Sequence, residues 1–295
     1  MPRPDFFIVG APKCGTTAMV QYLDDHPDIF FPDAKEVHFF GTDLVSRHYT
    51  RDLNRYLSLF NDWKGQNRIG EASVWYLYSK KAAEEIHAFD PDARIIIMLR
   101  NPVEMIYSNY YQLFFNGDED IPTFEEALAA EPDRKAGRRI PNDCRLVESL
   151  FYRDGAMFTN QVQRYFDVFG REAVHVIIFD DFKLDVAQSY RQTLQFLGVD
   201  ADFTTDFPRV NANKMVRSRT LKRLLQPIPN RLRQLRRFRV LRRGFRKFNQ
   251  FNTRYVSRPA MNPDLRQQLQ SEFAPEVERL GALLDRDLMH WVNPD

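Results

Sequence analysis

The sequence has few cysteines, no long hydrophobic run and, in one segment, no acidic residue at all. Only Cys14 and Cys144 are cysteines among 295 residues, which excludes a small disulfide-rich fold and favours a reducing compartment. No apolar run approaches the roughly 20 residues that span a bilayer. The first predicted strand begins within five residues of the start, which leaves no room for a signal peptide. We therefore expect a soluble, cytoplasmic protein without a disulfide.

Acidic residues are missing from residues 207–263, which hold 17 of the 42 lysines and arginines. The rest of the chain has 25 basic against 40 acidic residues. Within this segment, apolar side chains recur every three or four positions over 230–248, which predicts a basic amphipathic helix. Three roles fit this helix: it could pack on the acidic remainder of the protein, bind an anionic cofactor or glycan, or contact an anionic membrane surface peripherally. We expect no specific nucleic-acid binding.

The lysine of a standard Walker A motif is also missing, although an anion-binding turn follows the first predicted strand. Phe6–Val9 is apolar, and two glycines then bracket a loop before Thr16 and Thr17 open a helix. Backbone N–H groups at a helix start favour phosphate or sulfate. Thr16 stands where Walker A has its lysine, and Lys13 lies inside the loop instead. The turn therefore predicts an anion site without guaranteeing a triphosphate and magnesium.

A carboxylate and an imidazole follow this turn closely. Charged and apolar residues alternate over 33–41, and in an extended segment Glu36 and His38 would share one face. Together they are candidates for proton transfer. A half-exposed edge strand with ordinary surface charges is the alternative interpretation.

A second strand, turn and helix repeats the layout of the first. Arg94–Arg100 is the clearest predicted strand, and it ends in Arg100-Asn101-Pro102. A helix follows that carries Ser108 about two turns in. Ligands of open parallel sheets bind at the carboxyl ends of strands. This position favours anion binding by Arg100 over a surface ion pair.

Strands and helices alternate over residues 5–198, which predicts a three-layer α/β fold with a mainly parallel sheet flanked by helices. We interpret residues 1–295 as one domain. It would comprise the α/β core at 5–198, the basic segment at 207–263 and a C-terminal part at 264–290. The helix of this last part is predicted from about Asp264 to Leu284.

Three segments resemble sulfotransferases that use 3′-phosphoadenosine 5′-phosphosulfate (PAPS). Gly10–Thr17 resembles the loop for the 5′-phosphosulfate, Arg94–Ser108 the motif for the 3′-phosphate, and Lys35–Phe40 the segment with the catalytic glutamate. The heparan sulfate and bacterial carbohydrate-type members are the most similar in motif, and Glu71-Ala72-Ser73 and Leu197-Gly198 also fit them. The resemblance implies a P-loop-like sulfotransferase fold.

The resemblance also implies the reaction. A sulfuryl group would move from PAPS to a hydroxyl or amine of an acceptor, with adenosine 3′,5′-bisphosphate (PAP) as the other product and no metal required. A carbohydrate or glycolipid acceptor is expected, and a small natural-product alcohol is equally allowed by the motifs.

Residue roles follow from the resemblance position by position. Glu36 is the expected base, His38 the alternative base, and Lys13 the cation at the leaving group. Trp75 is placed near the adenine. The Lys-Gly pair of some members is absent from the loop expected to close on the nucleotide. The residues expected to bind PAPS are Lys13, Cys14, Gly15, Thr16, Thr17, Arg100, Ser108, Arg217 and Arg219.

Two other functions compete with sulfuryl transfer. In a P-loop kinase or NTPase, Ile177–Asp180 would serve as a Walker B strand. In a non-catalytic polyanion-binding module, the basic segment would bind its ligand alone, with steep salt dependence.

Overall fold

The computed structural model describes residues 2–46, 48–208, 214–216, 253–255 and 258–293. The chain divides into two compact units, one formed by Met1–Val210 and Met261–Asp295 and the other by Asn211–Ala260. The first unit contains the α/β core. That both units work as one domain stays a prediction.

A five-stranded sheet forms the centre of the first unit, and each pair of neighbouring strands is parallel. The strand order is β2-β3-β1-β4-β5, so β1 and β4 lie side by side although far apart in sequence. Their register pairs Phe6 with Arg94 and Ile8 with Ile96. The strands are β1 (Phe6–Gly10), β2 (Ile29–Phe30), β3 (Arg68–Ala72), β4 (Arg94–Leu99) and β5 (Val174–Ile178).

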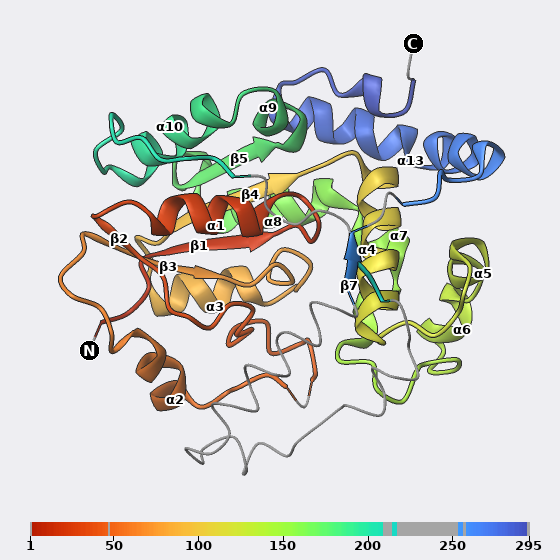
Figure 1. The fold of residues 1–295 in the computed structure, drawn as a ribbon, viewed down its shortest axis with the longest axis horizontal. Helices are drawn as coiled ribbons and strands as arrows, with labels where there is room; N and C mark the ends of the chain where they lie inside the picture. The colour runs from red at the N-terminus through yellow and green to blue at the C-terminus, as the bar shows by residue number, and fades with distance from the viewer. Residues whose placement is uncertain (1, 47, 209–213, 217–252, 256–257, 294–295) are drawn as a thin grey trace. The chain divides into compact units, whose positions relative to one another are not determined.

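Helices cover both faces of this sheet, which confirms the predicted three-layer α/β fold. Figure 1 shows α1, α9 and α10 on one face, and α3 and α8 on the other. These helices are α1 (Thr16–Asp24), α3 (Ala82–Phe89), α8 (Phe158–Phe169), α9 (Phe179–Leu184) and α10 (Val186–Leu197). The unit also contains α2 (Leu53–Leu57), α4 (Pro102–Asn116), α5 (Phe124–Ala129), α6 (Glu131–Lys135), α7 (Tyr152–Gly155) and α13 (Pro263–Leu284).

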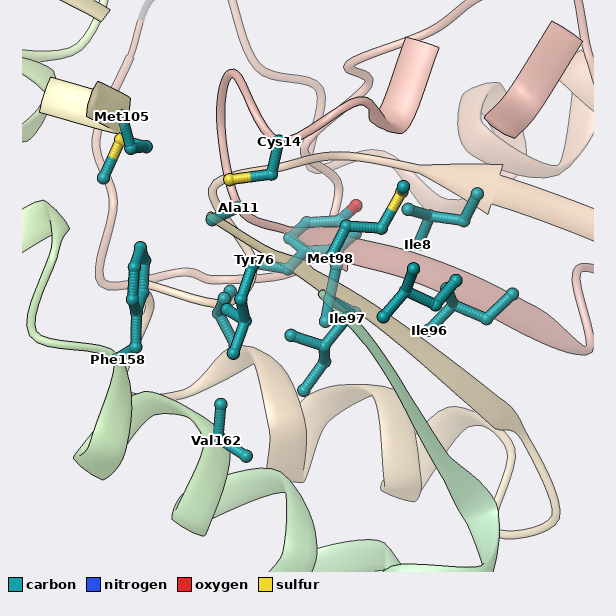
Figure 2. Close-up of a cluster of buried hydrophobic side chains, with 14 of the residues drawn as sticks. Ile8, Ala11, Cys14, Tyr76, Ile96, Ile97, Met98, Met105, Phe158 and Val162 are labelled. Atoms are coloured by element: carbon teal, nitrogen blue, oxygen red, sulfur yellow. The ribbon is translucent and has the colours of Figure 1, made fainter. Parts of the chain in front are cut away.

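The core is centred on β1 and β4, because both strands are covered on their two faces. All five residues of β1 are buried, and so are the last five of β4. Side chains of the two strands meet those of the helices in the cluster of Figure 2, where Ile8 and Ile96 lie beside Met98. Central parallel strands have continuous apolar sequences for this reason.

The C-terminal helix, α13, is also where the sequence predicts it. Its start is marked by Asn262 and Pro263, and the Asn262 side chain accepts hydrogen bonds from the N–H groups of Asp264 and Leu265. The helix ends at Leu284, where the sequence predicts its end, and it begins one residue earlier than predicted, at Pro263. No helix among the described residues is long and apolar enough to cross a membrane.

The second unit contains a two-stranded antiparallel sheet. Its strands are β6 (Lys214–Val216) and β7 (Thr253–Tyr255), with Met215 opposite Arg254. The predicted basic helix at 230–248 lies outside the described residues, and so do Arg217 and Arg219.

Candidate active site

The candidate site lies at the carboxyl ends of β1 and β4, where the connections that follow the two strands lead to opposite sides of the sheet. From β1 the chain continues to one side of the sheet, toward β2, and from β4 it continues to the other side, toward β5. Crevices for ligands in open α/β sheets form at such switch points. The loop with Lys13 follows β1, and Arg100 follows β4, so the fold brings these two predicted motifs together.

The loop after β1 has the backbone of an anion-binding turn. Gly15 is the residue before α1 and has a φ of +94°, a left-handed conformation that suits glycine. A β-carbon on Gly15 would lie 3.3 Å or less from the Phe179 and Phe182 rings and from the Met98 methyl group. The N–H of Ala11 donates to the Met98 carbonyl over 2.7 Å and fastens the loop to β4. Thr16 and Thr17 then present the orphan N–H groups of a nine-residue helix.

Lys13 is directed toward α4. Its Nζ donates to Oε1 of Gln112 over 3.1 Å, and its carbonyl accepts a hydrogen bond of 3.4 Å from Arg100. The second predicted motif thus contacts the first directly. Gln112 was not predicted, because only the fold places this part of α4 beside the loop.

Cys14 contributes to the core and not, through its side chain, to the anion site. The thiol is fully buried, donates to the Pro12 carbonyl, and lies in the apolar cluster drawn in Figure 2. Burial raises its pKa to about 12, against the lowering effect of Arg100 and Lys13. Only the backbone N–H of Cys14 is left as a donor to an anion. Both cysteines are free, as the sequence predicts.

Glu36 and His38 meet, although not for the reason that the alternating pattern suggests. The segment that carries them is not a strand, and the two residues have left-handed φ angles of +62° and +50°. Nε2 of His38 lies 3.1 Å from Oε2 of Glu36. The expected extended geometry is therefore wrong, whereas the expected pair of side chains is present.

Neighbouring groups keep the Glu36 carboxyl ionised. Burial by itself raises its pKa, but the hydrogen bond and charge of His38, the charge of Lys35 and the N–H of Val74 outweigh burial and lower the pKa below its ordinary value. The Val74 N–H donates to Oε2 over 3.1 Å. The side chain of Glu36 keeps 36% of its surface exposed, whereas His38 is buried. Glu36 thus offers an accessible carboxylate held by a buried imidazole.

The Ser73 hydroxyl and the buried carboxyl of Glu71 form a hydrogen-bond chain that ends at the His38 backbone. Ser73 Oγ accepts a hydrogen bond from the His38 N–H (3.0 Å) and donates to Oε1 of Glu71 (2.6 Å). Glu71 is 1% exposed, and its Oε2 has no hydrogen-bond partner among the described residues. Burial raises the pKa of Glu71 to about 7, although the hydroxyls of Ser73, Tyr76 and Tyr56 favour the charged form.

Arg51 holds the segment that carries Glu36 and His38. Its Nη1 donates to the carbonyls of His38 (2.7 Å), Phe39 and Phe40 (2.8 Å), and its Nη2 donates to those of Gly41 and Leu44 (2.8 Å each). A planar guanidinium with several donors can satisfy several carbonyls of a non-regular segment at once. Arg51 lies 13 residues beyond His38 in the sequence, and no sequence pattern indicated its role.

Arg100 directly follows β4, and Ser108 lies in the second turn of α4. The Arg100 guanidinium stacks over the Phe179 ring at 4.9 Å and lies 3.5 Å from Oε2 of Glu104. Ser108 is 1% exposed, and its Oγ has no hydrogen-bond partner in the described part of the chain. A buried hydroxyl without a partner is costly. This unsatisfied hydroxyl fits a ligand with an oxygen at that point.

Lys35 connects the loop to the Glu36 carboxylate. Its Nζ donates to Oγ1 of Thr17 over 2.8 Å and lies 3.5 Å from Oε1 of Glu36. Trp75, placed near an adenine by the sequence, is half-buried and packs edge-to-face on Tyr78 at 5.8 Å. Arg217 and Arg219 belong to the part of the chain that the structure does not describe.

Comparison with known proteins identifies the family and the fold. The sulfotransferase domain family matches residues 3–281. The crystal structure of a sulfotransferase from Alicyclobacillus acidocaldarius is 34% identical, covers 99% of this chain and 100% of its own, and has a TM-score of 0.76.

Curated relatives match over part of their length. Carbohydrate sulfotransferase 15 from Homo sapiens is 32% identical over 42% of this chain and 30% of its own. Heparan sulfate glucosamine 3-O-sulfotransferase 6 from Homo sapiens is 36% identical over 43% of this chain and 34% of its own. The chain thus spans about a third of the length of these two relatives. Because the family match extends over almost the whole chain and the fold agrees, this protein belongs to the sulfotransferase domain family.

Proposed function

We propose that this protein transfers a sulfuryl group from PAPS to a hydroxyl or amine of an acceptor. One observation carries the proposal: an ionised, accessible carboxylate, Glu36, is linked through Lys35 to Thr17 of an anion-binding loop. A base and an anion site this close together fit the transfer of an anionic group to a group that must lose a proton.

The residues present fit the two anionic ends of the donor. The N–H groups of Gly15, Thr16 and Thr17 at the start of α1 would hold the 5′-phosphosulfate. Arg100 would hold the 3′-phosphate together with the Ser108 hydroxyl, which lacks a partner within the described ranges. Arg217 and Arg219 remain proposed as members of a loop that closes on the nucleotide.

When bound, PAPS supplies the sulfuryl group: a bond forms between the acceptor oxygen and sulfur, and the bond from sulfur to the 5′-phosphate oxygen breaks, leaving its electron pair on that phosphate. Glu36 takes the acceptor's proton on its carboxylate, and His38 holds that carboxylate in place. Lys13 and the loop N–H groups stabilise the charge on the departing phosphate. Preorganised donors of this kind supply several kcal/mol, roughly 3 for each donor removed.

The acceptor that we propose is a carbohydrate or glycolipid. Support comes from the names of the two curated relatives above and from a glutamate in the position of the base. A small alcohol is compatible with the same base. Peripheral contact of residues 230–248 with an anionic membrane would suit a glycolipid.

The direct test is a transfer assay with labelled PAPS and a panel of glycans, glycolipids and phenols, run in EDTA. We expect label in one acceptor class, and we expect PAP to bind without metal. If the protein requires ATP and Mg²⁺ and ignores PAP, it is a P-loop kinase or NTPase. Salt-sensitive binding to polyanions with no transfer to any acceptor would identify a binding module instead.

Replacement of Glu36, the proposed base, tests its role directly. Glu36→Gln should lower kcat by about 10²–10⁴-fold, the usual contribution of a general base. The Kd for PAP should stay within about twofold, because the nucleotide is held by the loop and not by this carboxylate. Glu125→Gln, on the exposed side of α5, is the matched control. Wild-type turnover of Glu36→Gln would transfer the role of base to His38.

A further inference from the structure

In the described part of the chain, three cationic side chains lie at the anion-binding loop, and the proposed reaction gives a role to two of them. Lys13 belongs to the loop and is directed by Gln112. Arg100 follows β4 and stacks on Phe179. The third is Lys35, which comes from the same segment as Glu36 and reaches back to α1.

Lys35 lies between the two halves of the site. Its Nζ is 2.8 Å from Oγ1 of Thr17, in the first turn of α1, and 3.5 Å from Oε1 of Glu36. One charge therefore contacts both the loop for the donor and the carboxylate for the acceptor. The side chain is 25% exposed, so most of its surface is covered while part of it remains within reach of a ligand.

We propose that Lys35 is a catalytic residue that contacts the non-bridging oxygens of the sulfuryl group during transfer. The proposal rests on the function proposed above. In that reaction sulfur leaves a phosphate held at Thr17 and reaches an acceptor oxygen held at Glu36. A cation that touches both residues therefore lies beside the path of the sulfuryl group.

The two lysines would stabilise different parts of the negative charge on the reacting groups. Lys13 lies within the loop, where the oxygen that leaves sulfur gains charge. Lys35 approaches from the side of Glu36, where the acceptor oxygen forms its new bond to sulfur and its proton passes to the carboxylate. An ammonium group supplies three donors, so Lys35 can keep its contact with Thr17 while it binds a sulfuryl oxygen.

The experiment compares two nucleotides that differ by the sulfuryl group. PAPS has it and PAP lacks it, so a contact to the sulfuryl oxygens strengthens only the binding of PAPS. Calorimetric Kd values are measured for both nucleotides, and kcat for transfer, in the wild type, Lys35→Ala, Lys35→Arg and the exposed control Lys64→Ala.

We expect Lys35→Ala to lower kcat by about 10²–10³-fold, as is usual when one preorganised donor to a developing charge is removed. It should weaken PAPS at least about fivefold and leave PAP within about twofold, and Lys35→Arg should recover part of both losses because it keeps the charge. Lys64→Ala should match the wild type.

The readouts separate this role from others. Equal weakening of PAPS and PAP would overturn the proposal, since Lys35 would then bind the phosphate. A loss of kcat confined to low pH would also overturn it, because Lys35 would then only keep Glu36 ionised. If the wild type binds neither nucleotide, the proposed function fails and the role of Lys35 fails with it. Wild-type transfer with a fully active Lys35→Ala contradicts the role of Lys35 alone.

Discussion

At the scale of single residues, the pair of Glu36 and His38 depends on the backbone conformation of the segment that carries it. Glu36 and His38 meet because both residues adopt left-handed backbone conformations, and five carbonyls of their segment are bound by Arg51. Left-handed φ angles are unfavourable for residues with a β-carbon. The segment keeps them because its N–H and C=O groups are bound from two sides.

Glu71 is the residue whose charge we expect to oppose folding. Its pKa is about 7 in the folded protein, against an ordinary value of 4.5, so the native state holds the proton more tightly than the unfolded state does. The stability associated with this proton is fully present below about pH 4.5 and is lost as pH rises through about 7. The loss corresponds to about 3 kcal/mol at roughly 1.4 kcal/mol for each pH unit.

Glu71→Gln should remove this dependence, because the amide cannot ionise and its oxygen can still accept from Ser73. Urea unfolding at about pH 5 and about pH 8 measures the effect, and we expect the variant to gain stability over the wild type at the higher pH only. Glu125→Gln provides the control for an exposed carboxylate. An equal gain at both pH values would show that burial of the charge is not the cause.

At the scale of elements, three neighbouring strands position the residues of the candidate site. β1 ends in the loop with Lys13, and β4 ends at Arg100, which donates to the Lys13 carbonyl. β3 leads into the segment with Ser73 and Val74, whose groups bind His38 and Glu36. The carboxyl ends of these three parallel strands thus place the predicted donor loop, the predicted 3′-phosphate motif and the candidate base at one edge of the sheet.

Gly10 shows how closely these elements approach. A β-carbon there would lie 2.5 Å from Cβ of Leu77 and 2.9 Å from the Val74 carbonyl, and neither atom can swing aside as the end of a side chain can. Gly10→Ala should therefore destabilise the protein by about 1–3 kcal/mol and lower kcat, because Val74 holds Glu36. Gly155→Ala is the control, since nothing described lies within 4 Å of its added carbon.

Thermal unfolding and transfer kinetics measure both effects of Gly10→Ala. A loss of about 1 kcal/mol corresponds to roughly 2–4 °C in Tm for domains of about two hundred residues. A variant that unfolds earlier but turns over normally would show that the contact with Leu77 and Val74 serves stability alone.

At the scale of the whole molecule, the charge of the chain is divided. Residues 207–263 have 17 basic and no acidic residues, whereas the remainder is acidic. A concentrated positive segment attracts anionic partners over about one Debye length, which is about 10 Å at about 0.1 M salt. We therefore expect an anionic glycan acceptor to be recognised through this segment, and a neutral alcohol not to be.

Salt should separate these acceptors. With PAPS saturating, raising NaCl from about 50 to about 300 mM should increase the KM for a sulfated glycan severalfold, because screening weakens long-range attraction. The KM for a neutral alcohol should stay nearly constant under the same conditions. Equal KM values for the glycan at both salt concentrations would argue against acceptor binding by the basic segment.

Local sequence signals predict the fold class and most of the residues proposed for the candidate site. Continuous apolar runs identify central strands, since a strand covered on both faces tolerates few polar residues, and the glycines, Pro102 and Asn262 mark turns and helix starts by their backbone preferences. These local signals are sufficient to locate the loop at Lys13, Arg100 and Ser108. The proposed variants are needed to establish the roles of these residues.

The distant groups that support the site are visible only once the chain has folded. Gln112 reaches Lys13, Arg51 binds the segment of Glu36, and Lys35 bridges Thr17 and Glu36. Periodicity cannot reveal such contacts, because they depend on where strands and helices pack and not on spacing along the chain. The same holds for the pKa of Glu71, which is raised first by burial, a property that exists only once the chain has folded.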